Sequence, residues 1–264
     1  MLGAIIGDVV GSIYEFTSHK SKAFPLFTAS SRPTDDSVMT VAVGCACAEG
    51  DPDDEESFKA LLTEKMRELG RLYPNAGFGD AFYDWLMDDN ATAYGSYGNG
   101  AAMRVSPVAW LARSLKEAER LAKWSAEISH DHPDAIRGAQ AVAGSIYLAR
   151  NGADKAEIRA YVERNYYDLS YTLDEIRPTY RFSLASEQSV PQAILCFLEG
   201  ADYEDSIRNA ISLGGDGDTQ AAIAGSIAEA YFGIPEELQE RVFDYVDSPL
   251  VDYYWSYADV LYGN

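Results

Sequence analysis

Basic residues are scarce in this chain of 264 residues. Only 21 Lys and Arg side chains stand against 42 Asp and Glu, which gives a formal net charge of -21 at pH 7. Such a charge repels nucleic-acid phosphates and anionic membrane surfaces unless a local basic patch or a bound cation reverses the field. Because the sequence has no basic cluster of that kind, we expect neither nucleic acid nor membrane among its partners.

Cysteine and long apolar runs are also rare. Cys45, Cys47 and Cys196 lie within short apolar stretches, which favours buried free thiols over a disulfide framework or a zinc site. The N-terminal stretch lacks a basic leader, and Asp8 interrupts its apolar residues before they reach the length of a signal peptide. No other run approaches membrane-spanning length. These absences predict a cytoplasmic protein.

Apolar residues are abundant, at 47% of the chain, and most recur at helical rather than alternating spacing. Proline and glycine signals between these segments predict about ten helices. The sequence shows no flexible linker, charge block or tandem repeat. We therefore expect an all-α fold in which residues 1–264 form a single compact multi-helix domain that acts as a monomer. The aromatic stretch Tyr253 to Tyr257 is expected to pack over the core, with an oligomer contact as the alternative.

The first helix carries glycines and acids at helical spacing. Gly3, Gly7 and Gly11 share one face, which predicts close approach of a neighbouring helix. Asp8 and Glu15 are seven residues apart, so we expect both on one face of this helix, looking into the same cavity.

Two short clusters, far apart in the sequence, combine hydroxyl and carboxylate groups. Thr34-Asp35-Asp36 and Asp216-Gly217-Asp218-Thr219 each precede an apolar run. Carboxylates and hydroxyls without His or Cys suit Mg²⁺, Mn²⁺ or Ca²⁺, and four gathered carboxylates would repel one another without a cation. The alternative is that Asp36 and Thr219 only cap helices. An EF-hand is excluded, because Ala221 and Ile227 stand where that loop needs Gly and Glu.

Other segments offer groups for a ligand. The glycine-rich stretch from Gly95 to Arg104 would cradle a phosphate with its backbone N–H groups and the dipole of a following helix, although an ordinary loop is the alternative. Tyr97 could stack on a base or ribose. Gly77-Phe78-Gly79 indicates a flexible aromatic turn, and His130 either donates a hydrogen bond to a ligand or sits at a solvent-facing helix end.

Taken together and in order, these segments resemble the ADP-ribosylglycohydrolase family. The likeness extends over nearly the whole chain and is carried by residues 3–8 with Glu15, 34–37, 77–79, 98–104, 129–133 and 214–219.

This resemblance implies an all-α enzyme that uses two Mg²⁺ or Mn²⁺ ions to release ADP-ribose from an ADP-ribosylated protein or a small ADP-ribose adduct. The implied metal ligands are Thr34, Asp35, Asp36, Asp216, Asp218 and Thr219. The implied substrate contacts are Phe78, Gly79, Ser96, Tyr97, Gly98, Asn99, Gly100, Ala101 and His130. Glu15 would gate or assist cleavage, and Glu15, Asp35 and Asp36 all qualify by type as the base that takes the proton of water, with Glu15 preferred.

One residue departs from the family pattern. Gly217 stands where many members have threonine, so a hydroxyl is missing in the middle of the motif, while both aspartates and the final threonine remain. We expect metal binding to survive with a less rigid loop. The loop from Ser96 to Gly100 and the position of Glu15 look closer to the branch that cleaves O-linked ADP-ribose, such as serine conjugates, than to the arginine-specific branch. The alternatives are hydrolysis of a small adduct such as O-acyl-ADP-ribose, and a catalytically silent ADP-ribose-binding protein.

Overall fold

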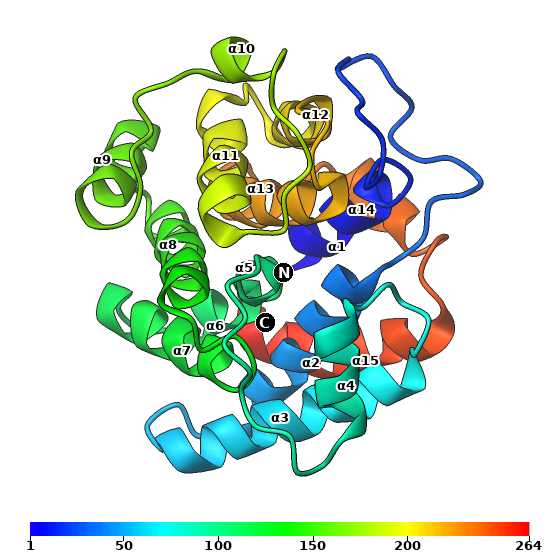
Figure 1. Cartoon of the computed structure of the whole chain (residues 1–264), viewed down its shortest axis with the longest axis vertical. Helices are drawn as coiled ribbons and strands as arrows, with labels where there is room; N and C mark the ends of the chain where they lie inside the picture. Colours follow the sequence, from blue (N-terminus) through cyan, green and yellow to red (C-terminus); the bar gives the residue numbers. More distant parts are fainter. Residues whose placement is uncertain (264) are drawn as a thin grey trace.

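The computed structural model describes residues 1–263, which form fifteen α-helices and no β-strand (Figure 1). The first seven helices are α1 (Leu2–Gly11), α2 (Asp35–Glu49), α3 (Glu55–Leu72), α4 (Asp80–Met87), α5 (Gly100–Met103), α6 (Ser106–Leu111) and α7 (Leu115–Glu127). The other eight are α8 (Pro133–Arg150), α9 (Lys155–Asn165), α10 (Leu173–Ile176), α11 (Ser186–Glu199), α12 (Tyr203–Ser212), α13 (Gly217–Phe232), α14 (Glu236–Val242) and α15 (Ser248–Tyr262).

The all-α prediction is confirmed, but the expected number of about ten helices was too low. Helices α5 and α10 have 4 residues each, α6 has 6 and α14 has 7. Such helices span at most about two turns, which is too short for an apolar period to be recognised in the sequence.

Helices α1 and α13 lie side by side at the centre of the molecule (Figure 1). Every residue of α1 is buried. Its glycines face α13, and a β-carbon on Gly7 would collide with the main chain of Ala221, as one on Gly11 would with that of Asp218. This confirms the predicted close approach, and it places Asp8 of α1 beside the first turn of α13.

Two groups of helices enclose this central pair. Helices α11 and α12 pack on α13, while α2 packs on α1 and is itself covered by α3 and α15 (Figure 1). The aromatic stretch near the C-terminus lies in α15, where Tyr254 and Tyr257 are buried and Trp255 is half exposed. Packing over the core is therefore confirmed for these two tyrosines.

The end of α1 differs from the expectation. The helix stops at Gly11, so the prediction that Asp8 and Glu15 share one helix face was wrong. Ser12 Oγ donates a hydrogen bond to the Val9 carbonyl at 2.9 Å and accepts one from Arg32 N at 3.2 Å. These bonds hold the chain in a turn over residues 12–16, and Glu15 stands in that turn.

The three cysteines are free and buried, as predicted. Burial raises the pKa of the Cys45 thiol to about 11, which keeps it protonated and unreactive near neutral pH. Within residues 1–263, every helix is too short or too polar to traverse a lipid bilayer.

Candidate active site

Asp8 organises the first acidic cluster. Both of its carboxylate oxygens are buried and accept hydrogen bonds at the start of α2: from Thr34 N at 2.8 Å, Thr34 Oγ1 at 2.6 Å, Ser37 N at 3.0 Å and Ser37 Oγ. A carboxylate at a helix N-terminus satisfies free N–H groups and complements the helix dipole. Asp8 therefore fixes the backbone that carries Asp35 and Asp36. The sequence placed Asp8 near the cavity but did not reveal this role.

The second cluster forms the first turn of α13. Asp216 is the N-cap residue, yet its side chain makes no capping hydrogen bond and instead accepts one from Asn99 Nδ2 at 2.6 Å. Asp218 Oδ1 accepts a hydrogen bond from Thr219 N at 2.9 Å. The helix dipole favours negative charge here, but the Asp216 carboxylate is directed away from capping and toward the site.

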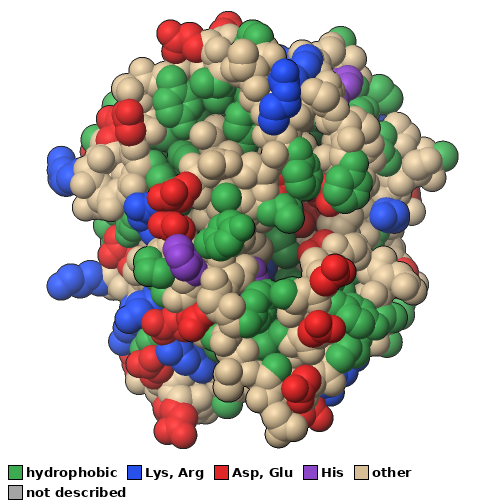
Figure 2. Space-filling view, in the orientation of Figure 1, with side chains coloured by type: hydrophobic (Ala, Val, Ile, Leu, Met, Phe, Trp, Pro, Cys, Tyr) green, Lys and Arg blue, Asp and Glu red, His purple; other side chains and the backbone are tan. Residues whose placement is uncertain are grey.

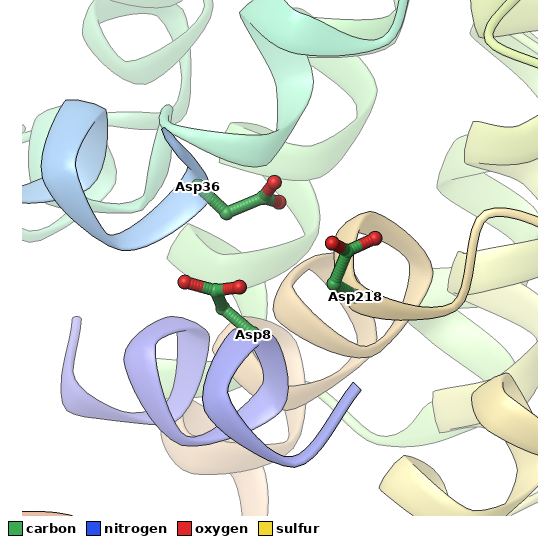
Figure 3. A group of neighbouring side chains, drawn as sticks. All are labelled: Asp8, Asp36 and Asp218. Carbon is green, nitrogen blue, oxygen red and sulfur yellow. The ribbon is translucent and has the colours of Figure 1, made fainter. Parts of the chain in front are cut away.

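The two clusters meet. Thr219 Oγ1 donates a hydrogen bond to Asp36 Oδ2 at 3.2 Å, which joins residues that are 183 positions apart. The caps of the two helices are Thr34 and Asp216, so the alternative that Asp36 and Thr219 serve as N-caps was wrong. Figure 3 shows the carboxylates of Asp8, Asp36 and Asp218 converging from α1, α2 and α13.

The carboxylate oxygens form two overlapping groups suited to cations. One oxygen each from Asp8, Asp36 and Asp218 lies within 4.8 Å of the others, and the same holds for Glu15, Asp216 and Asp218. Asp36 Oδ1 is buried and has no hydrogen-bond partner among residues 1–263. A buried carboxylate oxygen without a donor is costly, and an all-oxygen set suits a hard divalent ion. The residues present therefore fit such a metal centre.

The same crowding raises the pKa values of the acids. Burial raises the pKa of Asp35 to about 8, with a further contribution from the charge of Asp8. Burial and the charge of Asp216 raise the pKa of Glu15 to about 7, and Arg32 partly offsets the rise. Both shifts arise because negative charge is unfavourable in a buried site that already holds other carboxylates.

The glycine-rich loop lies beside the second acidic cluster, where Asn99 contacts Asp216, and it is pinned to the start of α11. Gly98 forms an isolated antiparallel bridge with Ala185, and Asn99 N donates to the Leu184 carbonyl at 2.8 Å. The helix predicted to follow the loop is present as α5, but it has only 4 residues, so its dipole is small. The N–H groups of Gly95, Gly98 and Asn99 already donate to Asp131, Ser96 Oγ and the Leu184 carbonyl. Among the described residues, those of Ser96, Tyr97 and Gly100 have no acceptor and remain for anion binding.

These elements enclose a cavity of about 520 Å³, within the range of small-molecule sites. Figure 2 shows a hollow on this face, with acidic side chains inside it and hydrophobic side chains around it. Most predicted site residues line the cavity: Glu15, Asp35, Asp36, Gly79, Ser96, Tyr97, Gly98, Asn99, Gly100, His130, Asp216, Asp218 and Thr219. Three predicted residues do not line it directly: Thr34, Phe78 and Ala101.

His130 belongs to the cavity wall and not to a solvent-facing helix end. Its side chain is 6% exposed, and burial, together with the charge of Arg104, lowers its pKa well below the ordinary value. Phe78 is half-buried and does not line the cavity, and its ring centroid lies 5.7 Å from that of Phe82, which does.

Several lining residues were missed by the sequence analysis: Phe16, Asp80, Ala81, Phe82, Tyr94, Met103, Arg104, Phe182 and Leu184. The sequence offered a signal for Met103 and Arg104, because they stand at the end of the glycine-rich segment. Phe182 and Leu184 had none, since they fall in an irregular segment without a motif. Phe182 reaches the cavity rim through a contact between its ring and that of Phe16, with centroids 5.8 Å apart.

Comparisons with known proteins agree with this arrangement. The family model described as ADP-ribosylglycohydrolase matches residues 1–263. The human protein named ADP-ribosylhydrolase ARH3 is 28% identical, with 95% of this chain and 90% of that protein covered. The ADP-ribosylarginine hydrolase Tri1 of Pseudomonas putida (strain GB-1) is 26% identical, with 92% and 72% covered. A solved structure titled "ADP-ribosylglycohydrolase-related protein complex" shares the fold, with a TM-score of 0.62, 21% identity and coverage of 99% and 94%.

Proposed function

Because this chain belongs to the ADP-ribosylglycohydrolase family and is a hydrolase that acts on ADP-ribose linkages, we propose that it releases ADP-ribose from a modified protein side chain with the help of two Mg²⁺ or Mn²⁺ ions. The observation that carries the proposal is the hydrogen bond from Thr219 to Asp36, which closes two distant acidic clusters into one floor beneath the cavity.

The proposed metal ligands are the residues of these two clusters: Thr34, Asp35, Asp36, Asp216, Asp218 and Thr219. Asp8 supports them by fixing the start of α2. Divalent ions bound there would supply Lewis acidity, lowering the pKa of water and orienting ribose hydroxyls. The neighbouring carboxylates themselves favour the positive charge that develops at the anomeric carbon during glycosidic cleavage.

Glu15 is the proposed proton-transfer residue. Among the described residues its carboxylate has no hydrogen-bond donor, whereas Asp36 and Asp216 are held by Thr219 and Asn99. It is half-buried in the turn over residues 12–16 and lines the cavity. Asp35 is the other uncommitted acid. The preference for Glu15 rests on the family resemblance, in which Glu15 gates or assists cleavage and Asp35 is a metal ligand, which would make Asp35 a weaker base.

The loop from Ser96 to Gly100 and its backbone N–H groups are proposed to hold the diphosphate and adenosine side of ADP-ribose, with Tyr97 as a stacking surface. Tyr97 is 60% exposed at the cavity rim, which leaves its ring face open to a base or ribose. His130, Phe82 and Gly79 complete that wall, and Phe78 and Ala101 are proposed to support it.

For the acceptor we propose an O-linked side chain such as serine in preference to arginine. The support is the likeness of the Ser96 to Gly100 loop and of the Glu15 position to the O-linked branch. Similarity alone does not separate the two, because the human ADP-ribosylhydrolase ARH3 and the arginine hydrolase Tri1 differ by only 2% in identity to this chain, 28% against 26%.

The test is ADP-ribose release from serine-linked peptide, arginine-linked peptide and O-acetyl-ADP-ribose, each with Mg²⁺, Mn²⁺ or a chelator. The proposal predicts fastest release from the serine conjugate and none with chelator. Release only from the free adduct would support a small-molecule hydrolase, and tight ADP-ribose binding without any release would support a silent binder.

We also propose that the protein is a cytoplasmic monomer that binds neither nucleic acid nor membranes. The net charge of -21 supports the absence of these two kinds of partner.

A further inference from the structure

His130 presents one ring nitrogen to the protein and the other to the glycine-rich loop. Its Nδ1 lies 2.9 Å from Ser129 Oγ, whereas a β-carbon on Gly100 would stand 2.9 Å from Nε2. The ring is flanked by Phe82 and Tyr94, with centroids 5.8 Å away in both cases. No residue among 1–263 hydrogen-bonds to Nε2, so this nitrogen is the one available to a ligand in the cavity.

Behind His130 stands Arg104, which is fully buried and forms no ion pair within the described chain. Its Nη2 donates to Ser129 Oγ at 2.8 Å and to the Ser125 carbonyl at 3.3 Å. Its guanidinium lies over the Phe82 ring at 5.3 Å. Arg104, Ser129 and His130 thus form a continuous chain of hydrogen bonds that ends at the cavity wall.

The protons carried by Arg104, Ser129 and His130 determine which group donates in each hydrogen bond of this series. Arginine has only donors, so Ser129 Oγ accepts from Arg104. The hydroxyl has one proton of its own, and in this fully buried position the Nδ1 atom of His130 is the one acceptor that the structure offers it. An unsatisfied buried hydroxyl proton would cost free energy. Donation from Ser129 makes Nδ1 the unprotonated nitrogen, so the ring proton must be on Nε2.

We propose that Arg104 and Ser129 are positioning residues that hold His130 as a neutral imidazole with its proton on Nε2, aimed past Gly100 as a hydrogen-bond donor. The partner would be an oxygen of ADP-ribose, either a diphosphate oxygen or a ribose hydroxyl, bound along the glycine-rich loop. The buried guanidinium also disfavours a second positive charge on the ring. The identity of the ligand rests on the proposed function, whereas the tautomer is a property of the ligand-free protein and does not depend on that function.

The tautomer is measured directly by long-range ¹H–¹⁵N correlation spectra of the histidine rings in the free protein at pH 7.5. The chain has only His19, His130 and His132, so a His130→Gln variant assigns the signal. We expect a neutral ring protonated on Nε2 alone. A ring protonated on Nδ1, or a doubly protonated ring, would overturn the proposal.

The role of Ser129 is tested with a matched pair of variants. Ser129→Ala removes the hydroxyl that contacts His130, whereas Ser125→Ala removes a buried hydroxyl that has no partner and keeps the carbonyl that binds Arg104. We expect Ser129→Ala to populate both tautomers and to raise the Kd for ADP-ribose about tenfold, with a smaller effect on kcat, since one hydrogen bond has that order of effect. Ser125→Ala should leave both readouts unchanged.

Identical ring spectra for Ser129→Ala and the wild type would overturn the proposal. Absence of ADP-ribose binding by the wild-type protein would contradict the proposed function instead, and the spectrum of the free protein would still decide the tautomer. The two failures are therefore distinguishable.

Discussion

Thr219 and Asp36 are separated by 183 residues in the sequence and by 3.2 Å between Oγ1 and Oδ2 in the structure. Their contact depends on α1, which packs against both α2 and α13. Gly7 and Gly11 allow α1 to approach the main chain of α13, and Asp8, on the same helix, binds the first turn of α2. One glycine-lined helix interface therefore sets the distance between the two acidic clusters.

Neutralising Asp218 should weaken metal binding without lowering the stability of the metal-free protein. Asp218 belongs to both carboxylate groups, and burial and its acidic neighbours raise its pKa well above the ordinary value. Asp218→Asn should weaken Mg²⁺ or Mn²⁺ binding by more than about 100-fold and abolish turnover. Without metal it should melt at the same or a higher temperature, because it removes an ionisable group whose charged form is unfavourable in this buried site.

The matched control for this change is Asp84→Asn, which removes the same charge from the exposed surface of α4. It should leave metal affinity unchanged. Equal metal affinity in wild type and Asp218→Asn, by calorimetry, would exclude Asp218 as a ligand.

Glu15→Gln should slow release of ADP-ribose by about 10²-fold or more while changing the Kd for ADP-ribose less than about threefold. The reason is that the substitution keeps size and polarity but removes a group that transfers a proton. Single-turnover release and calorimetry with ADP-ribose give the two numbers. Normal turnover would exclude a role for Glu15 in proton transfer.

The stability of the metal-free protein should fall as pH rises from about 6.5 to 8.5. The folded-state pKa values of Glu15 and Asp35, about 7 and about 8, lie above those of the unfolded chain. Their contribution is therefore fully present below the unfolded pKa values and is lost as pH rises through 7 and 8. Added Mg²⁺ should restore stability over the same interval, because it pairs with the ionised acids.

Thermal melting of chelator-treated protein with and without Mg²⁺ measures this effect. Asp35→Asn is the control, since it removes one of the two titrating groups and should flatten the pH dependence. A stabilisation by Mg²⁺ that does not grow between pH 6.5 and 8.5 would contradict the assignment of these acids to the metal centre.

Gly217 should tolerate a side chain where Gly7 does not. A β-carbon on Gly217 would meet Tyr14 atoms at 3.4 to 3.5 Å, an ordinary contact, whereas one on Gly7 would collide with the main chain of Ala221. Gly217→Ala should stabilise the protein by about 0.5 to 1 kcal/mol by restricting the unfolded chain. Gly7→Ala should destabilise it by about 1 to 3 kcal/mol or more. Urea denaturation checks both, and destabilisation by Gly217→Ala would contradict the expected fit against Tyr14.

The sequence predicted the elements whose signals are local. Helical spacing indicated the all-α fold, and contiguous motifs indicated the acidic clusters and the glycine-rich loop. The role of Asp8 was not predictable, because its four hydrogen bonds exist only after α1 and α2 have packed. The end of α1 at Gly11 was missed for a related reason, since Arg32 helps to hold that turn through Ser12. Phe182 and Leu184 enter the site from an irregular segment, where no periodic pattern marks a buried or ligand-facing side.

The most direct test of the central claim is a calorimetric titration of chelator-treated protein with Mn²⁺ and with Mg²⁺, followed by the same titration of Asp36→Asn. We expect two divalent ions per wild-type chain, and fewer or more weakly bound ions in the variant, because Asp36 lies where the two clusters join. Absence of saturable binding by the wild type, or unchanged stoichiometry and affinity in Asp36→Asn, would contradict it.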